Sequence, residues 1–153
     1  MVPIVTLDDL LVVWPFVKKG FLHIKKRDKS AGSQTHHQLF NAIRFGLPTP
    51  ERTNAVMLHV AVEGERTVRG FMVTCPLIDP FLSNTPVGIL VRYLYADFPM
   101  VQQFLPALKN LCRQYGGDVI EFQSGRLGWL RNFGRMKRLG WDIYHYTYRL
   151  TLD

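Results

Sequence analysis

Two side chains in this sequence could act as a general base, Glu121 and His59. Glu121 lies in the segment GDVIEFQS and His59 in the segment MLHVAV, and the apolar pattern predicts a strand for each. A carboxylate or an imidazole can accept a proton, directly or through one water, when it faces a cleft that holds a substrate. A sheet histidine more often has a structural role, and a lone carboxylate more often lies at the surface. The chemistry of both therefore depends on the faces of the sheet that they occupy.

The other reactive residue types have no spacing that indicates a site. Cys75 and Cys112 are far apart in the chain, so we interpret them as reduced, buried thiols. The histidine pair at 36–37 has no carboxylate or cysteine at ligand spacing, so the sequence predicts no metal site. Tyr93 and Tyr95 either line a cleft or pack in the core. The sequence contains no Ser-His-Asp, P-loop or dinucleotide signature.

Basic residues form a second group with a functional interpretation. The formal net charge of +7 suits a polyanionic partner, such as nucleic acid, a CoA nucleotide or an acidic protein surface. Arg131, Arg135 and Arg138 recur at spacings of four and three, so a helix would place them on one face. Together with the basic residues between positions 18 and 29 they would form a basic surface, or else a solvated polar face.

The composition indicates one packed domain. A chain of 153 residues with 47% hydrophobic residues is large enough for a core, and we expect a single domain over residues 1–153. No apolar run approaches the ~20 residues of a membrane helix. The apolar stretch Leu10 to Val17 lacks the basic start and the cleavage site of a signal peptide. We therefore expect a cytoplasmic protein that does not enter membranes.

The first third of the chain predicts two helices. Thr6 can cap the first, and Pro15 limits how regular that helix can be. The stretch Lys18 to Gly32 is basic and polar, and it ends in an exposed loop. Gln34 to Phe45 has the apolar spacing of an amphipathic helix, which Gly46 would end.

The rest of the chain predicts a sheet with further helices. Ala55 to Val62 and Thr67 to Cys75 are expected as a central hairpin, because both of its faces carry apolar residues. The elements expected after the hairpin are a strand at Gly88 to Phe98, a helix from about Pro99 to Gly116 with a kink or break at Pro106, a strand around Ile120, a helix at Leu127 to Leu139 and a strand at Asp142 to Leu152.

This order of elements resembles the GNAT (Gcn5-related N-acetyltransferase) fold, with the segment from Gly88 to Leu150 similar to its C-terminal half. The stretch from Met136 to Trp141 is similar to the aromatic-x-x-x-Gly-aromatic turn before the closing strands of that fold. The resemblance implies an α/β architecture with a mixed, mostly antiparallel sheet flanked by helices. It also implies that the fourth strand and the third helix would bind the pyrophosphate of acetyl-CoA.

The residues at the family's cofactor loop differ from its Arg/Gln-x-x-Gly-x-Gly/Ala signature. The glycine positions fall on Asp97, Pro99 and Val101. Asp97 puts a carboxylate where the family binds phosphate, Pro99 lacks an N–H donor, and Val101 adds a branched side chain. Asp97 and Pro99 also suit an ordinary capped helix start. The segment therefore predicts a capped helix with an eroded cofactor loop.

The family's catalytic acid is changed as well. Many members carry a tyrosine four residues before the glycine of the last turn, and Met136 occupies that position here. We therefore expect a GNAT-fold protein that works without a cofactor, as a non-catalytic binding or structural module with a protein partner or within an assembly. In this respect it looks like the small GNAT-like virion or accessory proteins of tailed phages.

Two alternatives remain open. One is an acetyl-CoA-dependent N-acetyltransferase, in which Arg92, Arg131 or Arg135 hold the phosphates and Glu121 or His59 acts as the base. The other is a nucleic-acid-binding domain that uses the basic face, with binding that falls steeply as salt rises.

Overall fold

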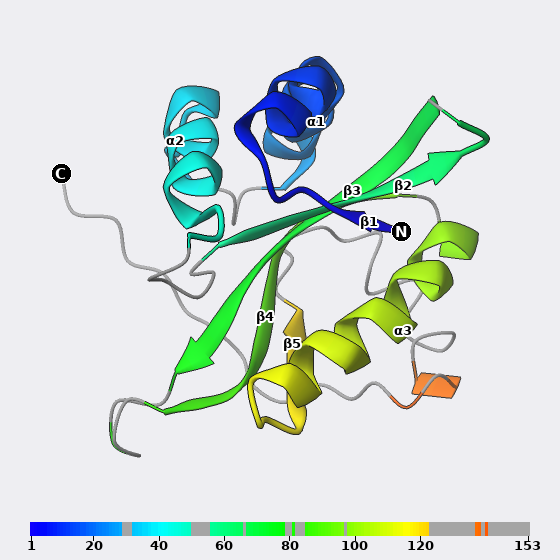
Figure 1. Ribbon diagram of the computed structural model, residues 1–153. Coiled ribbons are helices and arrows are strands. Elements are labelled where there is room, and N and C mark those ends of the chain that lie inside the picture. The colour runs from blue at the N-terminus through cyan, green and yellow to red at the C-terminus, as the bar shows by residue number, and fades with distance from the viewer. Residues whose placement is uncertain are drawn as a thin grey trace, which may run out of the picture.

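A mixed β-sheet organises the described part of the chain (Figure 1). The computed structural model describes residues 1–28, 32–49, 56–65, 67–78, 81, 85–96, 98–122, 137–138 and 140. Within these ranges five strands lie in the order β1-β2-β3-β4-β5, antiparallel except for the parallel pair β4 and β5. The strands are β1 (Val2–Pro3), β2 (Met57–Glu63), β3 (Thr67–Ile78), β4 (Pro86–Tyr95) and β5 (Val119–Phe122). The helices are α1 (Leu7–Arg27), α2 (His36–Gly46) and α3 (Phe98–Gln114).

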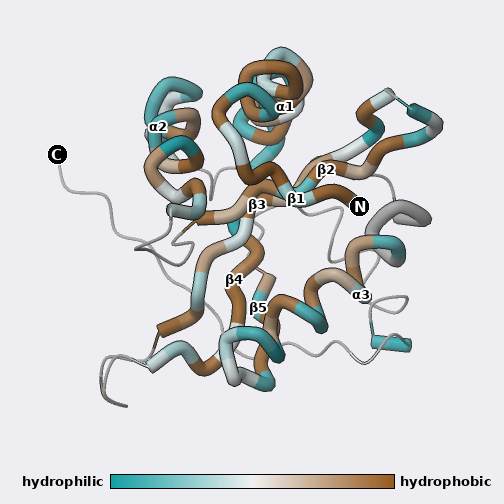
Figure 2. Tube along the Cα trace, viewed as in Figure 1, coloured by the Kyte–Doolittle hydropathy of each residue, from teal (hydrophilic) through white to brown (hydrophobic). Residues whose placement is uncertain are grey.

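The helices cover both faces of the sheet, as Figure 1 shows. Helices α1 and α2 lie on one face, where Leu58 and Val60 join a buried cluster with them. Helix α3 lies on the other face, against a cluster that includes Met57 and Ala61. Figure 2 shows hydrophobic residues along the strands and on the helices that cover them. The predicted central hairpin, apolar on both faces, is therefore confirmed, because alternate residues of β2 enter different clusters.

Helix α1 begins as predicted and continues further than expected. The Thr6 hydroxyl accepts a hydrogen bond from the Asp9 N–H at 3.1 Å, which caps the helix. The helix continues past Pro15, whose side is exposed, to Arg27. The stretch after Lys18 was expected to be basic and polar, yet Phe21 and Ile24 are buried within it. They extend the apolar stripe of α1 along the sheet, so packing maintains the helix.

Helix α2 has a complete capping box, in which Thr35 and Gln38 bond each other's backbone N–H groups. Helix α3 continues through Pro106 without a break. The sequence predicted a kink or a short break at this position. Pro106 lies on the exposed side, where water can bond the carbonyl group that loses its helical partner. After α3 the chain turns at Gly116, with φ +71°, as predicted.

The parallel pairing of β4 and β5 is short. It runs from Gly88 opposite Val119 to Val91 opposite Phe122. Beyond Val91, β4 continues to Tyr95 along β3, and no described residue pairs with it on the β5 side. The sheet therefore opens between β4 and β5 in the described part of the chain. No helix of that part is long and apolar enough to span a membrane.

Candidate functional site

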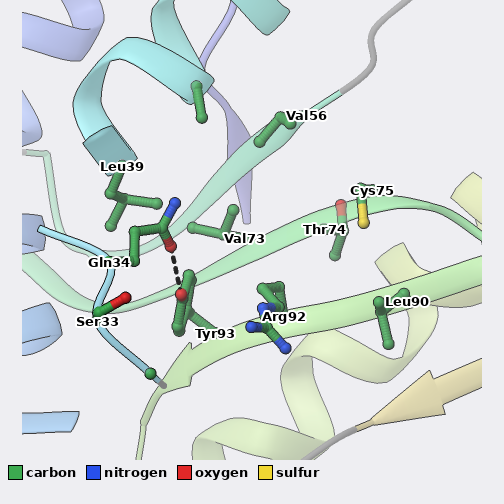
Figure 3. A pocket seen from close by; sticks show the side chains of 12 residues that line it. Ser33, Gln34, Leu39, Val56, Val73, Thr74, Cys75, Leu90, Arg92 and Tyr93 are labelled. Carbon is green, nitrogen blue, oxygen red and sulfur yellow. Dashed lines mark hydrogen bonds between the residues drawn. The ribbon is translucent and has the colours of Figure 1, made fainter. Parts of the chain in front are cut away.

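A pocket of about 560 Å³ opens on the face of the sheet that α1 and α2 cover (Figure 3). Its walls come from the connection between α1 and α2, from α2, and from the middle of the strands. The lining residues are Gly32, Ser33, Gln34, Leu39, Ala42, Val56, Val73, Thr74, Cys75, Leu90, Arg92 and Tyr93. A volume of this size suits a small organic molecule.

A β-bulge in β4 shapes one wall of the pocket. Val73 pairs with Tyr93 and Thr74 with Val91, so Arg92 is the extra residue on β4. Neighbouring residues of a regular strand point to opposite faces, yet Arg92 and Tyr93 both line this pocket. The Arg92 guanidinium carbon lies 5.7 Å from the centre of the Tyr93 ring. The bulge thus brings a cation and a phenol together at the point where β4 separates from β5.

Gln34 is fixed at the rim of the pocket by two hydrogen bonds. The Lys25 ammonium donates to the Gln34 carbonyl oxygen at 2.6 Å. The Tyr93 hydroxyl donates to the Gln34 side-chain oxygen, as the dashed line in Figure 3 shows. Because that oxygen is occupied by Tyr93, the amide nitrogen of Gln34 remains as a donor, and Figure 3 shows it turned away from Tyr93.

The titratable groups of the pocket are held in their protonated forms. Burial raises the pKa of the Tyr93 hydroxyl, and the charge of Arg92 and its hydrogen bond to that hydroxyl oppose the rise. Burial likewise raises the pKa of the Cys75 thiol, again against the charge of Arg92. Both groups are therefore neutral hydrogen-bond donors near pH 7, and neither supplies a base.

No family model matches this sequence, and no curated protein matches it either. Solved structures match it over nearly the whole chain. A ribosomal-protein-alanine N-acetyltransferase from Brucella melitensis biovar Abortus has a TM-score of 0.64 at 12% identity, with 99% of this chain and 97% of that chain covered. An aminoglycoside 6'-N-acetyltransferase from Acinetobacter haemolyticus has a TM-score of 0.62 at 8% identity, covering 100% and 99%. A probable acetyltransferase has a TM-score of 0.66 at 13% identity, with both chains fully covered at 100%.

The chain has the GNAT fold. The predicted mixed, mostly antiparallel sheet flanked by helices is confirmed. The helix predicted at residues 127–139 and the strand predicted at 142–152 fall largely outside the described residues.

The structure separates the two predicted bases. Glu121 pairs with Leu90, which lines the pocket, so the register places both side chains on the pocket face of this GNAT fold. Glu121 is half-buried there. His59 alternates with Leu58 and Val60 and faces α3 on the other side of the sheet. It is 6% exposed and does not line the pocket.

The predicted cofactor-binding residues remain largely untested. Pro99 and Val101 lie in the first turn of α3. Asp97, Arg131 and Arg135 lie outside the described residues. Arg92, proposed from the sequence as a phosphate ligand, lines the pocket.

Sequence reasoning missed Gln34 and left the role of Tyr93 open. Gln34 stands in a polar stretch with no motif, and its bond to Tyr93 joins residues 59 positions apart. No local pattern could have revealed that contact. Tyr93 lines the pocket, whereas Tyr95 stacks on Phe71 at 5.8 Å between ring centres. The sequence left open whether these tyrosines line a cleft or pack in the core. In the structure Tyr93 lines the pocket and Tyr95 packs in the core.

Proposed function

We propose that this protein is an N-acyltransferase, which moves an acyl group from an acyl-CoA thioester to an amine bound in the pocket. The observation that carries the proposal is the position of the pocket. It lies at the bulge of Arg92, where β4 leaves β5, so a donor along the open edge of β4 would meet an acceptor in the pocket. The fold supports the proposal, since two similar structures are N-acetyltransferases for other acceptors.

The backbone beside the pocket fits an acyl-CoA. The stretch of β4 from Arg92 to Tyr95 offers N–H and C=O groups that no described residue of β5 bonds. An amide-bearing arm can add to such an edge as a strand does. Helix α3 starts at Phe98, and its first-turn N–H groups have no helical partner. Pro99 removes one of these donors, while Phe98, Met100 and Val101 retain theirs for a phosphate.

The proposed reaction is direct acyl transfer. The neutral amine attacks the thioester carbonyl carbon, the C–S bond breaks, and the CoA thiolate leaves and takes a proton from water. The attacking nitrogen loses a proton, which Glu121 accepts through a water. Glu121 suits this role because it pairs with Leu90, which lines the pocket, so its side chain lies on the same face of the sheet as the pocket. His59 is on the opposite face and takes no part.

The test is an acyl-transfer assay with acetyl-CoA and a panel of primary amines, read by mass spectrometry of the products. The wild-type protein should yield N-acetylated product, and Glu121→Gln should lower kcat by roughly 10²–10⁴-fold with little change in the KM for acetyl-CoA. Asp118→Asn is the matched control, because Asp118 is an exposed carboxylate just before β5. Absence of transfer to every amine would contradict the proposal, and an unchanged Glu121→Gln rate would remove Glu121 from it.

A second candidate is the non-catalytic module predicted from the sequence. The observation that favours it is Pro99 in the first turn of α3, which reduces the number of phosphate-binding donors. The same assay separates the candidates. A protein that neither binds acetyl-CoA nor transfers its acyl group would be a GNAT-fold scaffold, as expected for a virion or accessory protein.

A further inference from the structure

Almost all of the net charge of the chain lies in one stretch of the sequence. Positions 10–50 hold seven lysines and arginines and one acidic residue, Asp28, so this stretch has a formal charge of +6 out of +7 for the whole chain. Asp28 is buried, at 6% exposure. The stretch contains most of α1 and all of α2. These two helices therefore present a positively charged surface on one side of the molecule.

The packing of the two helices brings cations from both of them together. Helices α1 and α2 lie side by side (Figure 1), with Trp14 of α1 against Phe40 of α2 at 4.9 Å between ring centres. A hydrogen bond also holds the end of α1 against the chain just before α2. One turn further along α1 is Lys18, and one turn back along α2 is His36. Both residues therefore lie on the same side of the aromatic contact.

The charges of this cluster act on one another. Burial lowers the pKa of His36. The positive charges of His37, Lys18 and Lys25 lower it further, so all three lie near this imidazole. None of these residues forms an ion pair with a carboxylate in the described part of the chain. We call the four residues Lys18, Lys25, His36 and His37 the basic rim.

The basic rim borders the pocket. The Lys25 ammonium donates to the Gln34 carbonyl oxygen at 2.6 Å, and Gln34 lines the pocket together with Ser33. A carbonyl group is neutral, so this bond leaves the charge of Lys25 uncompensated. His36 begins α2 two residues after Gln34, and Leu39 of the same helix lines the pocket. A molecule bound on the basic rim therefore has the pocket beside it.

We propose that the basic rim binds an acidic polypeptide segment, and that this segment carries the amine that enters the pocket. The second half of this assignment rests on the proposed acyltransferase function. Glutamate and aspartate side chains supply the negative charge that the described surroundings of the basic rim lack.

The chemistry of the acceptor favours a polypeptide over a nucleic acid. The amines of nucleobases are conjugated with their rings, so their lone pairs attack a thioester poorly. A polypeptide carries aliphatic amines, and its α-amino group, with a pKa of about 8, is partly neutral near pH 7. An acidic polypeptide thus combines the charge that fits the basic rim with the amine that the reaction needs.

The test is a calorimetric titration of the whole protein, without acetyl-CoA, by three probes. They are a peptide of alternating glutamate and glycine, the same peptide with glutamine in place of glutamate, and an oligothymidylate of matched charge. Wild-type protein should bind the glutamate peptide about tenfold or more tightly than the glutamine peptide at low salt. This preference should shrink as the salt concentration rises.

Two variants locate the binding surface. Lys18→Gln combined with Lys25→Gln should remove most of the preference for the glutamate peptide. Lys18→Glu alone keeps the bond from Lys25 to Gln34 and should also weaken the binding of that peptide, because it reverses one charge of the basic rim.

The control is Lys109→Gln combined with Arg113→Gln, which removes two exposed cations from α3 on the other face of the sheet. It lowers the net charge as much as the double variant of the basic rim does, yet it should leave the preference intact. An equal loss in the two double variants would overturn the inference. Equal binding of the two peptides, or tighter binding of the oligothymidylate, would overturn it as well.

The titration and the acyl-transfer assay can fail independently. Because acetyl-CoA is absent from the titration, a protein without a preference for the glutamate peptide can still acetylate amines. A protein that prefers the glutamate peptide but transfers no acyl group would retain the docking of an acidic segment and lose the proposed function.

Discussion

His59 is a titratable residue buried on the face of the sheet opposite the pocket. It lies on β2 opposite Pro3, on the face of the sheet that α3 covers, and its Nδ1 has no hydrogen-bond partner among the described residues. Burial, followed by the charge of the chain's N-terminus, lowers the pKa of His59 from 6.5 to about 4. The imidazole is therefore neutral at pH 7. Its contribution is packing, and it makes the fold sensitive to acid.

The pH dependence of stability should reveal this histidine. Between pH 6.5 and about 4 the unfolded chain binds a proton that the folded protein excludes. The free energy of unfolding therefore falls as the pH falls through this window, by at most about 3 kcal/mol from His59. In the His59→Leu variant, the free energy of unfolding measured with urea should fall less between pH 7 and pH 4.5 than it does in the wild type. His37→Leu, at an exposed position, should not.

An equal loss of unfolding free energy on acidification in His59→Leu and in the wild type would contradict this account of His59.

The sequence indicated which residues had side chains suited to catalysis, but not which face of the sheet each of them occupied. The register of β5 decides that Glu121 lies on the pocket side, and the bulge decides that Arg92 does. Both are properties of strand pairing over long sequence distances.

The ends of helices could be predicted where the sequence contains a residue that typically starts or ends a helix. Thr6 and Gly116 mark helix ends that the structure confirms. The extension of α1 to Arg27 was missed, because buried Phe21 and Ile24 are interspersed with lysines in the sequence. Gly20 explains how closely that helix packs. A Cβ there would lie 2.6 Å from the Phe71 ring, so only glycine allows this contact.

Gly88 controls the contact between β4 and β5. A Cβ at this position would lie 1.9 Å from the Val119 carbonyl oxygen, which belongs to the backbone and cannot rotate away. Gly88→Ala should therefore displace β5 and lower the free energy of unfolding by about 3 kcal/mol. It should also weaken acetyl-CoA binding, because the opening between the strands changes shape. Denaturant unfolding and calorimetry measure the two effects.

Gly64→Ala is the control for this prediction. Gly64 has φ +64° at the hairpin turn, and a Cβ there would meet nothing within 4 Å. Alanine should cost only the backbone strain of about 1 kcal/mol and leave acetyl-CoA binding unchanged. If both variants lost acetyl-CoA binding equally, the loss would reflect general destabilisation and not the β4–β5 opening.

At the scale of the whole molecule, the order of elements predicted the GNAT fold, which the structure confirms. The similar structures share only 8–13% identity with this chain yet cover nearly all of it. Layers of helix on sheet depend on the apolar pattern, which many sequences satisfy. Function depends on individual side chains, so the fold alone does not decide it. The pocket joins the connection between α1 and α2, helix α2, Val56 just before β2, and strands β3 and β4, a combination that no local pattern predicts.

The most direct test of the central claim is a calorimetric titration of the purified protein with acetyl-CoA. An acyltransferase with the donor along β4 and α3 should bind with a Kd in the micromolar range, about −8 kcal/mol. Gly88→Ala should weaken that binding, and Gly64→Ala should not. No detectable binding at millimolar acetyl-CoA would contradict the acyltransferase proposal and favour a GNAT-fold protein that works through another partner.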